Sequence, residues 1–197
     1  MNIAIIKYNA GNTKSVEHAL HRFGMQPIVT DDAEQIMKAD KVIFPGVGHA
    51  ETTMQHLKEK QLDIIIRNLK QPVLGICLGQ QLMCSHSEEG NIDCLNIFPV
   101  QVKKFQSSDN QYKIPQMGWN NLSDLKSSLF KDVGGNSFVY FVHSYFCELS
   151  EYSIATCDYI HPFSAALQKD NFYATQFHPE KSADTGSKIL QNFLLLC

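Results

Sequence analysis

Apolar residues in the first half of the chain fall in turn into short continuous runs and into the three- and four-residue spacing of a helix. The first helical pattern ends at Gly24 and consists of Val16, Ala19, Leu20 and Phe23. Strands and helices that alternate in this way favour a parallel sheet with right-handed crossovers. We expect strands at residues 3–7, 26–30, 42–44 and 73–76, and further helices between the second and third strands and at residues 50–58 and 62–70.

The second half of the chain is richer in strands. Its apolar runs predict strands at residues 100–105, 138–143, 152–157, 164–168 and 172–176, and a closing amphipathic helix at residues 184–196. The polar segments 106–111 and 123–136 are expected to be surface loops. We therefore predict an α/β fold with a mostly parallel open sheet flanked by helices, a strand-rich second half, and a single domain over residues 1–197.

Cys77 stands where the predicted strand turns into a helix, between Gly75 and Gly79. Two flanking glycines allow a tight, strained turn like the Gly-x-Ser-x-Gly elbow of hydrolases, in which the central residue is the nucleophile. A helix N-terminus stabilises an anion by only about 0.3–1 kcal/mol, too little to ionise a thiol at neutral pH. A nucleophilic Cys77 therefore needs a base from elsewhere in the chain. The alternative is a buried structural thiol.

His178 is the base that the sequence offers. Pro179 favours an extended backbone at His178, and residues two apart in an extended segment face the same way, so Glu180 can orient the imidazole. A His-Pro pair alone is more typical of a plain turn, which we expect at residues 161–162. Together with the cysteine elbow, the pattern predicts a triad of Cys77 as nucleophile, His178 as base and Glu180 as orienter.

Four segments, in order, resemble those of the class I glutamine amidotransferases of the triad type, and most closely the glutaminase subunits of imidazole glycerol phosphate synthase. The match spans nearly the whole chain. The elbow and the last segment are shared by most triad amidotransferases, whereas PGVG and MGWN select these subunits. The chain departs mildly at Gln80, where relatives often have methionine, and at Gln116, where histidine is frequent. The segments are residues 45–48 (PGVG), 75–81 (GICLGQQ), 115–120 (PQMGWN) and 176–181 (QFHPEK).

Attack of a thiolate on the side-chain amide of glutamine creates an oxyanion, which needs N–H donors about 2.7–3.1 Å away. We expect the backbone amide of Leu78 to be one donor. The other is expected from the loop of Gly46, Val47 and Gly48, because two glycines let a peptide plane rotate at little cost. Both this loop and Cys77 lie at carboxyl ends of predicted parallel strands, where ligands bind. The alternative for this loop is an ordinary turn at the end of a strand.

The resemblance also implies the residues that bind glutamine. Gln81 and Glu89 match positions that contact the amino-acid end of the substrate, and the carboxylate of Glu89 suits an α-ammonium group. Glu88 is the neighbouring alternative, and a solvated helix end is the non-functional one. A buried strand with a hydrogen-bonded histidine is the alternative for the segment at 143–145. The expected set is Gly46, Gln81, Glu89, His143, Ser144 and Tyr145.

The resemblance further implies that ammonia passes through a tunnel to a separate (β/α)₈-barrel cyclase subunit, as part of a heterodimer in histidine biosynthesis. That subunit would make imidazole glycerol phosphate and aminoimidazole carboxamide ribotide. Trp119 is the only tryptophan and lies in a polar stretch, which makes it a candidate for the interface. A core tryptophan with a hydrogen-bonded N–H is an equal alternative on the sequence alone. Asn12, Asn120 and Lys181 are further interface candidates.

Composition excludes several other classes. Seventeen Lys and Arg against 20 Asp and Glu give a net charge of −3, which offers no footprint for nucleic acid or an anionic membrane. The start of the chain lacks a signal-peptide pattern and no apolar run approaches ~18 residues, so a cytoplasmic location is expected. The six cysteines include no Cys-x-x-Cys pair and no zinc spacing, so we expect reduced thiols, no metal and no cofactor.

Two alternative functions remain open on the sequence. One is the glutaminase subunit of a different synthase, such as anthranilate or aminodeoxychorismate synthase. The other is a non-catalytic binding or redox protein of the same fold with a reactive cysteine at the elbow. That second alternative predicts no triad, so the presence of Cys77, His178 and Glu180 together argues against it.

Overall fold

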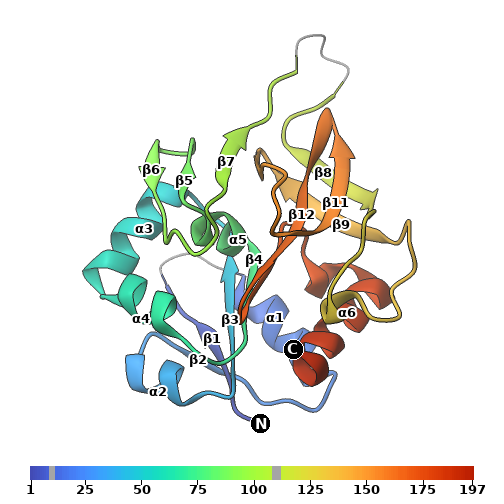
Figure 1. Ribbon diagram of the computed structural model, residues 1–197. Coiled ribbons are helices and arrows are strands. Elements are labelled where there is room, and N and C mark those ends of the chain that lie inside the picture. Colours follow the sequence, from blue (N-terminus) through green and yellow to red (C-terminus); the bar gives the residue numbers. More distant parts are fainter. Residues whose placement is uncertain (9–11, 108–111) are drawn as a thin grey trace.

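The computed structural model describes residues 1–8, 12–107 and 112–197. A mixed sheet runs through the molecule in the order β2-β1-β3-β4-β13-β12-β10-β7-β5-β6, with β11 paired to β12, and β8 and β9 form a separate two-stranded sheet (Figure 1). The strands are β1 Ile3–Ile6, β2 Ile28–Thr30, β3 Lys41–Gly46, β4 Val73–Cys77, β5 His86–Ser87, β6 Ile92–Asp93, β7 Gln101–Lys104, β8 Gln116–Asn121, β9 Phe138–His143, β10 Tyr145–Cys147, β11 Ser153–Tyr159, β12 His161–Lys169 and β13 Phe172–Thr175.

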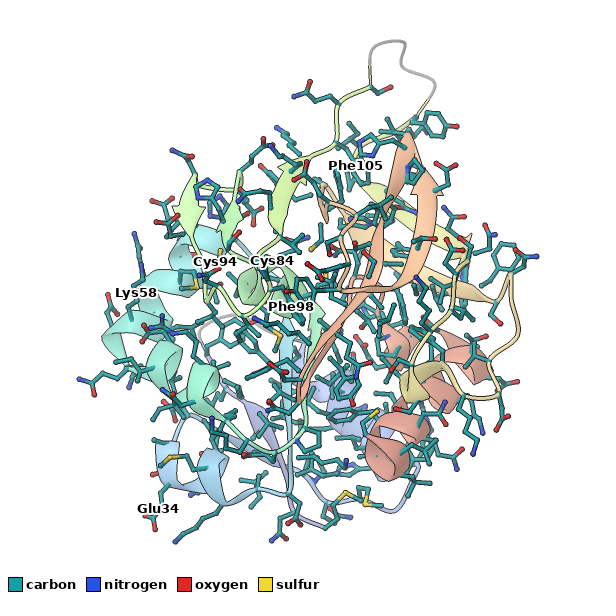
Figure 2. All side chains as sticks on the ribbon, viewed as in Figure 1. Glu34, Lys58, Cys84, Cys94, Phe98 and Phe105 are labelled. Atoms are coloured by element: carbon teal, nitrogen blue, oxygen red, sulfur yellow. The ribbon has the colours of Figure 1, made fainter. Side chains whose placement is uncertain are left out.

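Helices cover both faces of the parallel part of the sheet. Helices α1 and α6 pack on one face, and α2 to α5 pack on the other (Figure 1). Each face buries its own apolar cluster; in Figure 2, Phe105 belongs to the first cluster, and Cys84, Cys94 and Phe98 belong to the second. The helices are α1 Thr13–His21, α2 Ala33–Lys38, α3 Ala50–Glu59, α4 Leu62–Asn68, α5 Leu78–Met83 and α6 Ala183–Leu196, with 3₁₀ turns η1 Ser128–Phe130 and η2 Pro179–Lys181.

The strands β2, β1, β3, β4 and β13 are mutually parallel, which confirms the predicted fold class. All residues of β1, β3, β4 and β13 are buried, because helices cover both faces of a parallel sheet. In the register of the sheet, Gly46 lies opposite Cys77, and Ile76 lies opposite Thr175. The carboxyl ends of β3, β4 and β13 therefore meet at one edge, and the segments that follow them converge there.

Beyond β13 the pairs of the sheet are antiparallel, except for β5 and β7, which pair in parallel. The β8–β9 sheet packs beside the edge where the three strands end. The backbone N–H of His178 donates to the carbonyl of Tyr140 in β9 at 2.9 Å. In return the N–H of Tyr140 donates to the hydroxyl of Ser182 at 2.9 Å. These two bonds fix the segment after β13 to the middle of β9.

The structure contains four strands that were not expected from the sequence, β5, β6, β8 and β10. In addition, the pair His161-Pro162, expected as a turn, begins β12. The turn lies one residue earlier, at Ile160 with a φ of 63°, and Tyr159 pairs with His161 across it. Segment 123–136 is mostly irregular as predicted, apart from η1, and residues 108–111 of the other predicted loop lie outside the described residues. No helix in the described ranges is long and apolar enough to cross a membrane.

Candidate active site

Cys77 occupies a strained backbone position at the junction of β4 and α5. Its φ of 55° and ψ of −108° lie in a region that costs a non-glycine residue about 1–3 kcal/mol. Gly79 makes this junction possible, because a Cβ atom there would lie only 2.0 Å from the carbonyl oxygen of Phe44 in β3. The elbow predicted from the glycine spacing is therefore present, held between β4, α5 and β3.

The sulfur of Cys77 has two polar contacts of opposite kind. Its S–H donates to the carbonyl oxygen of Val142 in β9, with the sulfur 3.8 Å from that oxygen. The side-chain amide Nε2 of Gln176 donates to the sulfur, also at 3.8 Å. One contact uses the sulfur as a donor and the other uses it as an acceptor.

His178 and Glu180 form a buried hydrogen-bonded pair, with Nδ1 of the imidazole 2.8 Å from Oε1 of the carboxylate. His178 itself is extended, with φ −96° and ψ 96°. Glu180, however, lies in the 3₁₀ turn η2, so the expectation of an extended segment through both residues was wrong. The contact that it predicted exists because the tight turn after Pro179 brings the carboxylate back to the ring.

The pKa of His178 is strongly perturbed. Burial alone would lower the pKa of the imidazole, but its interactions with Cys77, and next with Glu180, raise it to about 10. Its Nε2 atom is buried and makes no conventional hydrogen bond within the described residues, which leaves it open to exchange a proton with Cys77. The raised pKa favours the protonated, imidazolium form of His178 beside Cys77 and Glu180.

A cavity of about 300 Å³ opens beside Cys77. It collects most of the residues expected to bind glutamine or to form the oxyanion hole, and it adds Pro115 and Val142, for which no role in the site was expected from the sequence. Pro115 begins the segment 115–120 that carried the resemblance, and Val142 directly precedes His143, so these neighbours were the available signals. The lining consists of Val47, Gly48, Cys77, Leu78, Gln81, Glu89, Pro115, Val142, His143, Ser144 and Tyr145.

The loop after β3 has an anchor at each end. The hydroxyl of Tyr8 donates to the carbonyl oxygen of Pro45 at 2.5 Å, and the N–H of Ala50 donates to Oε2 of Glu89 at 2.8 Å. Between these anchors Gly48 has a φ of 130°, a conformation that favours glycine over any residue with a Cβ. The loop is therefore anchored near both ends and has at its centre a conformation that glycine adopts most readily.

The comparisons with known proteins agree with this geometry. The family model for class I glutamine amidotransferases matches residues 4–197. The chain belongs to the class I glutamine amidotransferases. Its relatives include "Imidazole glycerol phosphate synthase subunit HisH" from Bacteroides fragilis, 61% identical over 196 residues and covering all of both chains. The protein of the same name from Bacteroides thetaiotaomicron is 58% identical, over 98% of this chain and 99% of that one.

A solved structure described as a glutamine amidotransferase shares the fold of this chain. It matches with a TM-score of 0.74 and 16% identity, over 97% of this amidotransferase and 96% of the other chain. At that level of identity the likeness concerns the fold alone.

Gly46 is the one expected substrate-binding residue that does not line the cavity of this amidotransferase. The strand β3 extends through Gly46, and the residue packs under the first turn of α5, where a Cβ would lie 2.6 Å from the Cβ of Leu78. Its position below the elbow, rather than in the loop, explains the difference.

The ring of His143 is engaged within the protein. Its Nδ1 lies 2.7 Å from the carbonyl oxygen of Tyr145, and its Nε2 lies 2.8 Å from Oε1 of Gln116. Burial lowers the pKa of His143 to about 4, against the opposing effect of the Tyr145 carbonyl. A neutral imidazole carries one N–H, so His143 can donate to one of these two oxygens, as a buried strand residue commonly does. His143, Ser144 and Tyr145 all still line the cavity.

The expected interface residues of the amidotransferase differ in accessibility. Trp119 is 52% exposed, so it is not a core residue, and its ring meets that of Tyr140 edge-on at 6.0 Å between centroids. Lys181 is exposed at the end of η2. The amide of Asn120 instead donates to the carbonyl of Asp158 at 2.9 Å, and Asn12 accepts a hydrogen bond from Ser15 at 2.8 Å.

All six cysteines of the amidotransferase are free thiols. Burial raises the pKa of Cys94 and of Cys157 to about 12, and it also raises the pKa of Cys84 and Cys197. Four of the other five thiols are therefore disfavoured as thiolates. Within the described ranges, no group of three or more His, Cys, Asp or Glu side chains could hold a metal ion.

Proposed function

We propose that this chain is the glutaminase subunit of imidazole glycerol phosphate synthase, and that Cys77, His178 and Glu180 carry its hydrolysis of glutamine to glutamate and ammonia. The observation that supports these roles is the strained backbone of Cys77 at the edge of a cavity, together with the buried hydrogen-bonded pair of His178 and Glu180. The full-length identity of 61% to a HisH subunit supports this choice of synthase.

In the first half of the reaction, His178 takes the proton of Cys77 and the thiolate attacks the side-chain carbonyl carbon of glutamine. A C–S bond forms and the carbonyl oxygen becomes an oxyanion, which accepts hydrogen bonds from the N–H of Leu78 and from the Val47-Gly48 loop. The C–N bond then breaks, and the departing nitrogen takes the proton back from His178 as ammonia. A thioester of glutamate remains on Cys77.

In the second half, His178 takes a proton from water, which attacks the thioester carbon. The C–S bond breaks, glutamate leaves, and the proton returns to the sulfur of Cys77. Glu180 keeps Nδ1 of His178 protonated and stabilises the imidazolium in both halves, because its carboxylate accepts a hydrogen bond from that atom.

The amino-acid end of glutamine lies against the far wall of the cavity in this proposal. Glu89 faces the α-ammonium group, Gln81 contacts the same end, and the backbone of Ser144 and Tyr145 holds the α-carboxylate. All four residues line the cavity together with Cys77, which supports a single binding mode for the substrate.

The ammonia is delivered to a partner subunit. The HisH relatives are named as synthase subunits, which implies a second subunit for the reaction. We propose that this partner is a (β/α)₈-barrel cyclase in a cytoplasmic heterodimer and that it docks on Asn12, Trp119, Asn120 and Lys181. Met117 and Phe138 are 66% and 57% exposed, and they share the outer face of the β8–β9 sheet with Trp119, which supports a docking role for that face.

The proposed function is tested with the purified chain, the cyclase and the nucleotide substrate of the cyclase. Glutamine should then yield glutamate and imidazole glycerol phosphate in equal amounts. Restored activity with the synthase partner of an anthranilate or aminodeoxychorismate system, but not with the cyclase, would favour the other glutaminases. Failure to release glutamate with every one of these partners would favour the non-catalytic alternative.

Glu180→Gln should slow acylation by at least about tenfold, but by less than His178→Ala, because the carboxylate assists while the imidazole transfers the proton. Glu180 helps to raise the pKa of His178. Its loss lowers that pKa, so the alkaline limb of the pH profile should move to lower pH. The measurement is the rate of glutamate formation from pH 6 to 10 in the complex with the partner. An unmoved profile with an unchanged rate would remove Glu180 from the triad.

Glu89→Gln should raise KM for glutamine by about tenfold or more, since a charge-assisted bond to the α-ammonium is lost. The amide oxygen of the substituted side chain can still accept a hydrogen bond from the N–H of Ala50, so kcat should change little. Glu89→Ala should lower kcat as well, because the loop anchor is lost too. Glu88→Gln is the matched control, since Glu88 bonds to Lys103 and the backbone of Lys104 outside the cavity. A larger rise in KM for Glu88→Gln than for Glu89→Gln would reverse the assignment.

A further inference from the structure

Two buried glutamine side chains connect the sulfur of Cys77 to the wall of the cavity. Gln176 is fully buried and Gln81 is 4% exposed. Nε2 of Gln81 donates to Oε1 of Gln176 at 2.9 Å, and Nε2 of Gln176 donates to the sulfur of Cys77 at 3.8 Å. Gln176 has no role in the triad or in the expected binding of glutamine, yet it reaches the reacting atom.

The orientation of both amides follows from a single fixed acceptor. Nε2 of Gln81 also lies 2.9 Å from the carbonyl oxygen of Tyr145. A carbonyl can only accept, so the NH₂ group of Gln81 must face it. The same NH₂ group faces Gln176, which must therefore present its oxygen. The NH₂ group of Gln176 is left pointing at the sulfur, and a flipped Gln176 would oppose two donors.

The two contacts of Cys77 prefer different protonation states. The carbonyl of Val142 accepts from the S–H group and therefore favours the thiol. The amide of Gln176 can only donate toward the sulfur, so its bond strengthens when the sulfur becomes negative. When His178 removes the proton, the contact with Val142 is lost and the contact with Gln176 remains.

We propose that the Gln176 amide is a catalytic group that stabilises the Cys77 thiolate by N–H donation, and that Gln81 is the positioning residue that holds this amide in the donating orientation. This inference rests on the proposed role of Cys77 as the nucleophile. Because Gln81 lines the cavity, the amino-acid end of the substrate and the sulfur share one buried hydrogen-bonded chain.

The test is the pH dependence of Cys77 alkylation by iodoacetamide, followed by mass spectrometry of the full chain without glutamine or partner. Gln176→Met keeps the size of the side chain and removes its donor. Alkylation at pH 7 should slow by about tenfold, with the midpoint of the pH profile about one unit higher. Gln81→Met should move the midpoint in the same direction by less, since the donor remains but loses its orientation.

Gln80→Met is the matched control. Gln80 is also fully buried, but its amide donates to the carbonyl of Ser164 at 3.1 Å and belongs to neither the nucleophile nor the cavity. The midpoint of the pH profile of Cys77 alkylation in Gln80→Met should equal that of the parent chain. A purely structural role of Gln176 would lower the melting temperature of Gln176→Met and leave the midpoint in place, and that result would overturn the proposal.

If Gln176→Met does not fold, the Gln81→Met variant provides the test. A midpoint of Cys77 alkylation that is unchanged in folded Gln81→Met would overturn the proposal. Alkylation needs no turnover of glutamine, so its outcome is independent of whether the chain acts with the cyclase. Absence of glutamate release in the complex, with the midpoint shifts as expected, would refute the proposed function and leave the Gln176 contact established.

Discussion

Cys77→Ala is expected to abolish glutamine-dependent synthesis by the complex while ammonia-dependent synthesis continues at its normal rate. In the proposed function the thiolate of Cys77 forms the thioester, whereas the cyclisation belongs to the proposed cyclase partner. Both activities are measured as imidazole glycerol phosphate formed by the same preparation, with glutamine or with an ammonium salt. The loss with glutamine should exceed about 10⁴-fold, as for the removal of other catalytic nucleophiles.

Cys84→Ala is the control for this substitution. Cys84 caps the C-terminus of α5, the helix that begins directly after Cys77. It is fully buried, its sulfur lies 3.5 Å from that of Cys147, and it does not line the cavity. It should retain both activities. Equal loss of the two activities in Cys77→Ala would contradict the division of labour between the subunits.

The second large effect concerns regulation by the partner. The isolated chain should hydrolyse glutamine slowly and should accelerate about 10²–10³-fold with the cyclase and its nucleotide ligand, the value of one oxyanion donor. This expectation rests on the loop between Pro45 and Ala50, which is anchored at both ends and in which Gly48 has a φ of 130°. A partner needs only a few kcal/mol to favour the productive peptide orientation. The measurement is glutamate release with and without both additions.

Gly48→Ala is the variant that tests this mechanism. A Cβ atom disfavours positive φ, so the loop loses the choice between two orientations. The acceleration by the partner should then shrink to less than about tenfold, whichever orientation the variant keeps. Fast hydrolysis by the isolated parent chain, unchanged by the cyclase and its ligand, would instead favour a free-standing glutaminase.

The parts of the site that the sequence predicted are those with short-range signals. The glycines around Cys77 mark a strained turn, and the contact of His178 with Glu180 spans only two residues. Even there, the backbone reason was wrong, because η2 rather than an extended segment brings Glu180 to the ring. Local sequence patterns predict which side chains come into contact more readily than they predict the backbone conformation that brings them together.

The parts that the sequence did not predict depend on strand pairing. Residues 116–121 contain glycine and two asparagines, which have low strand propensity, and they form β8 only because β9 pairs along their full length. The chain from Gln81 through Gln176 to Cys77 likewise exists only because β13 lies beside β4 in a particular register. No spacing along the sequence carries that information.

The strand β9 touches both members of the reacting pair. The carbonyl of Val142 accepts from Cys77, and the carbonyl of Tyr140 accepts from the N–H of His178. The ring of Tyr140 meets the ring of the exposed Trp119 in β8. A partner subunit that docks on Trp119, as proposed, would therefore contact a ring carried by the strand that hydrogen-bonds to both nucleophile and base. The surface proposed to receive the partner and the catalytic pair therefore both lie against the single strand β9.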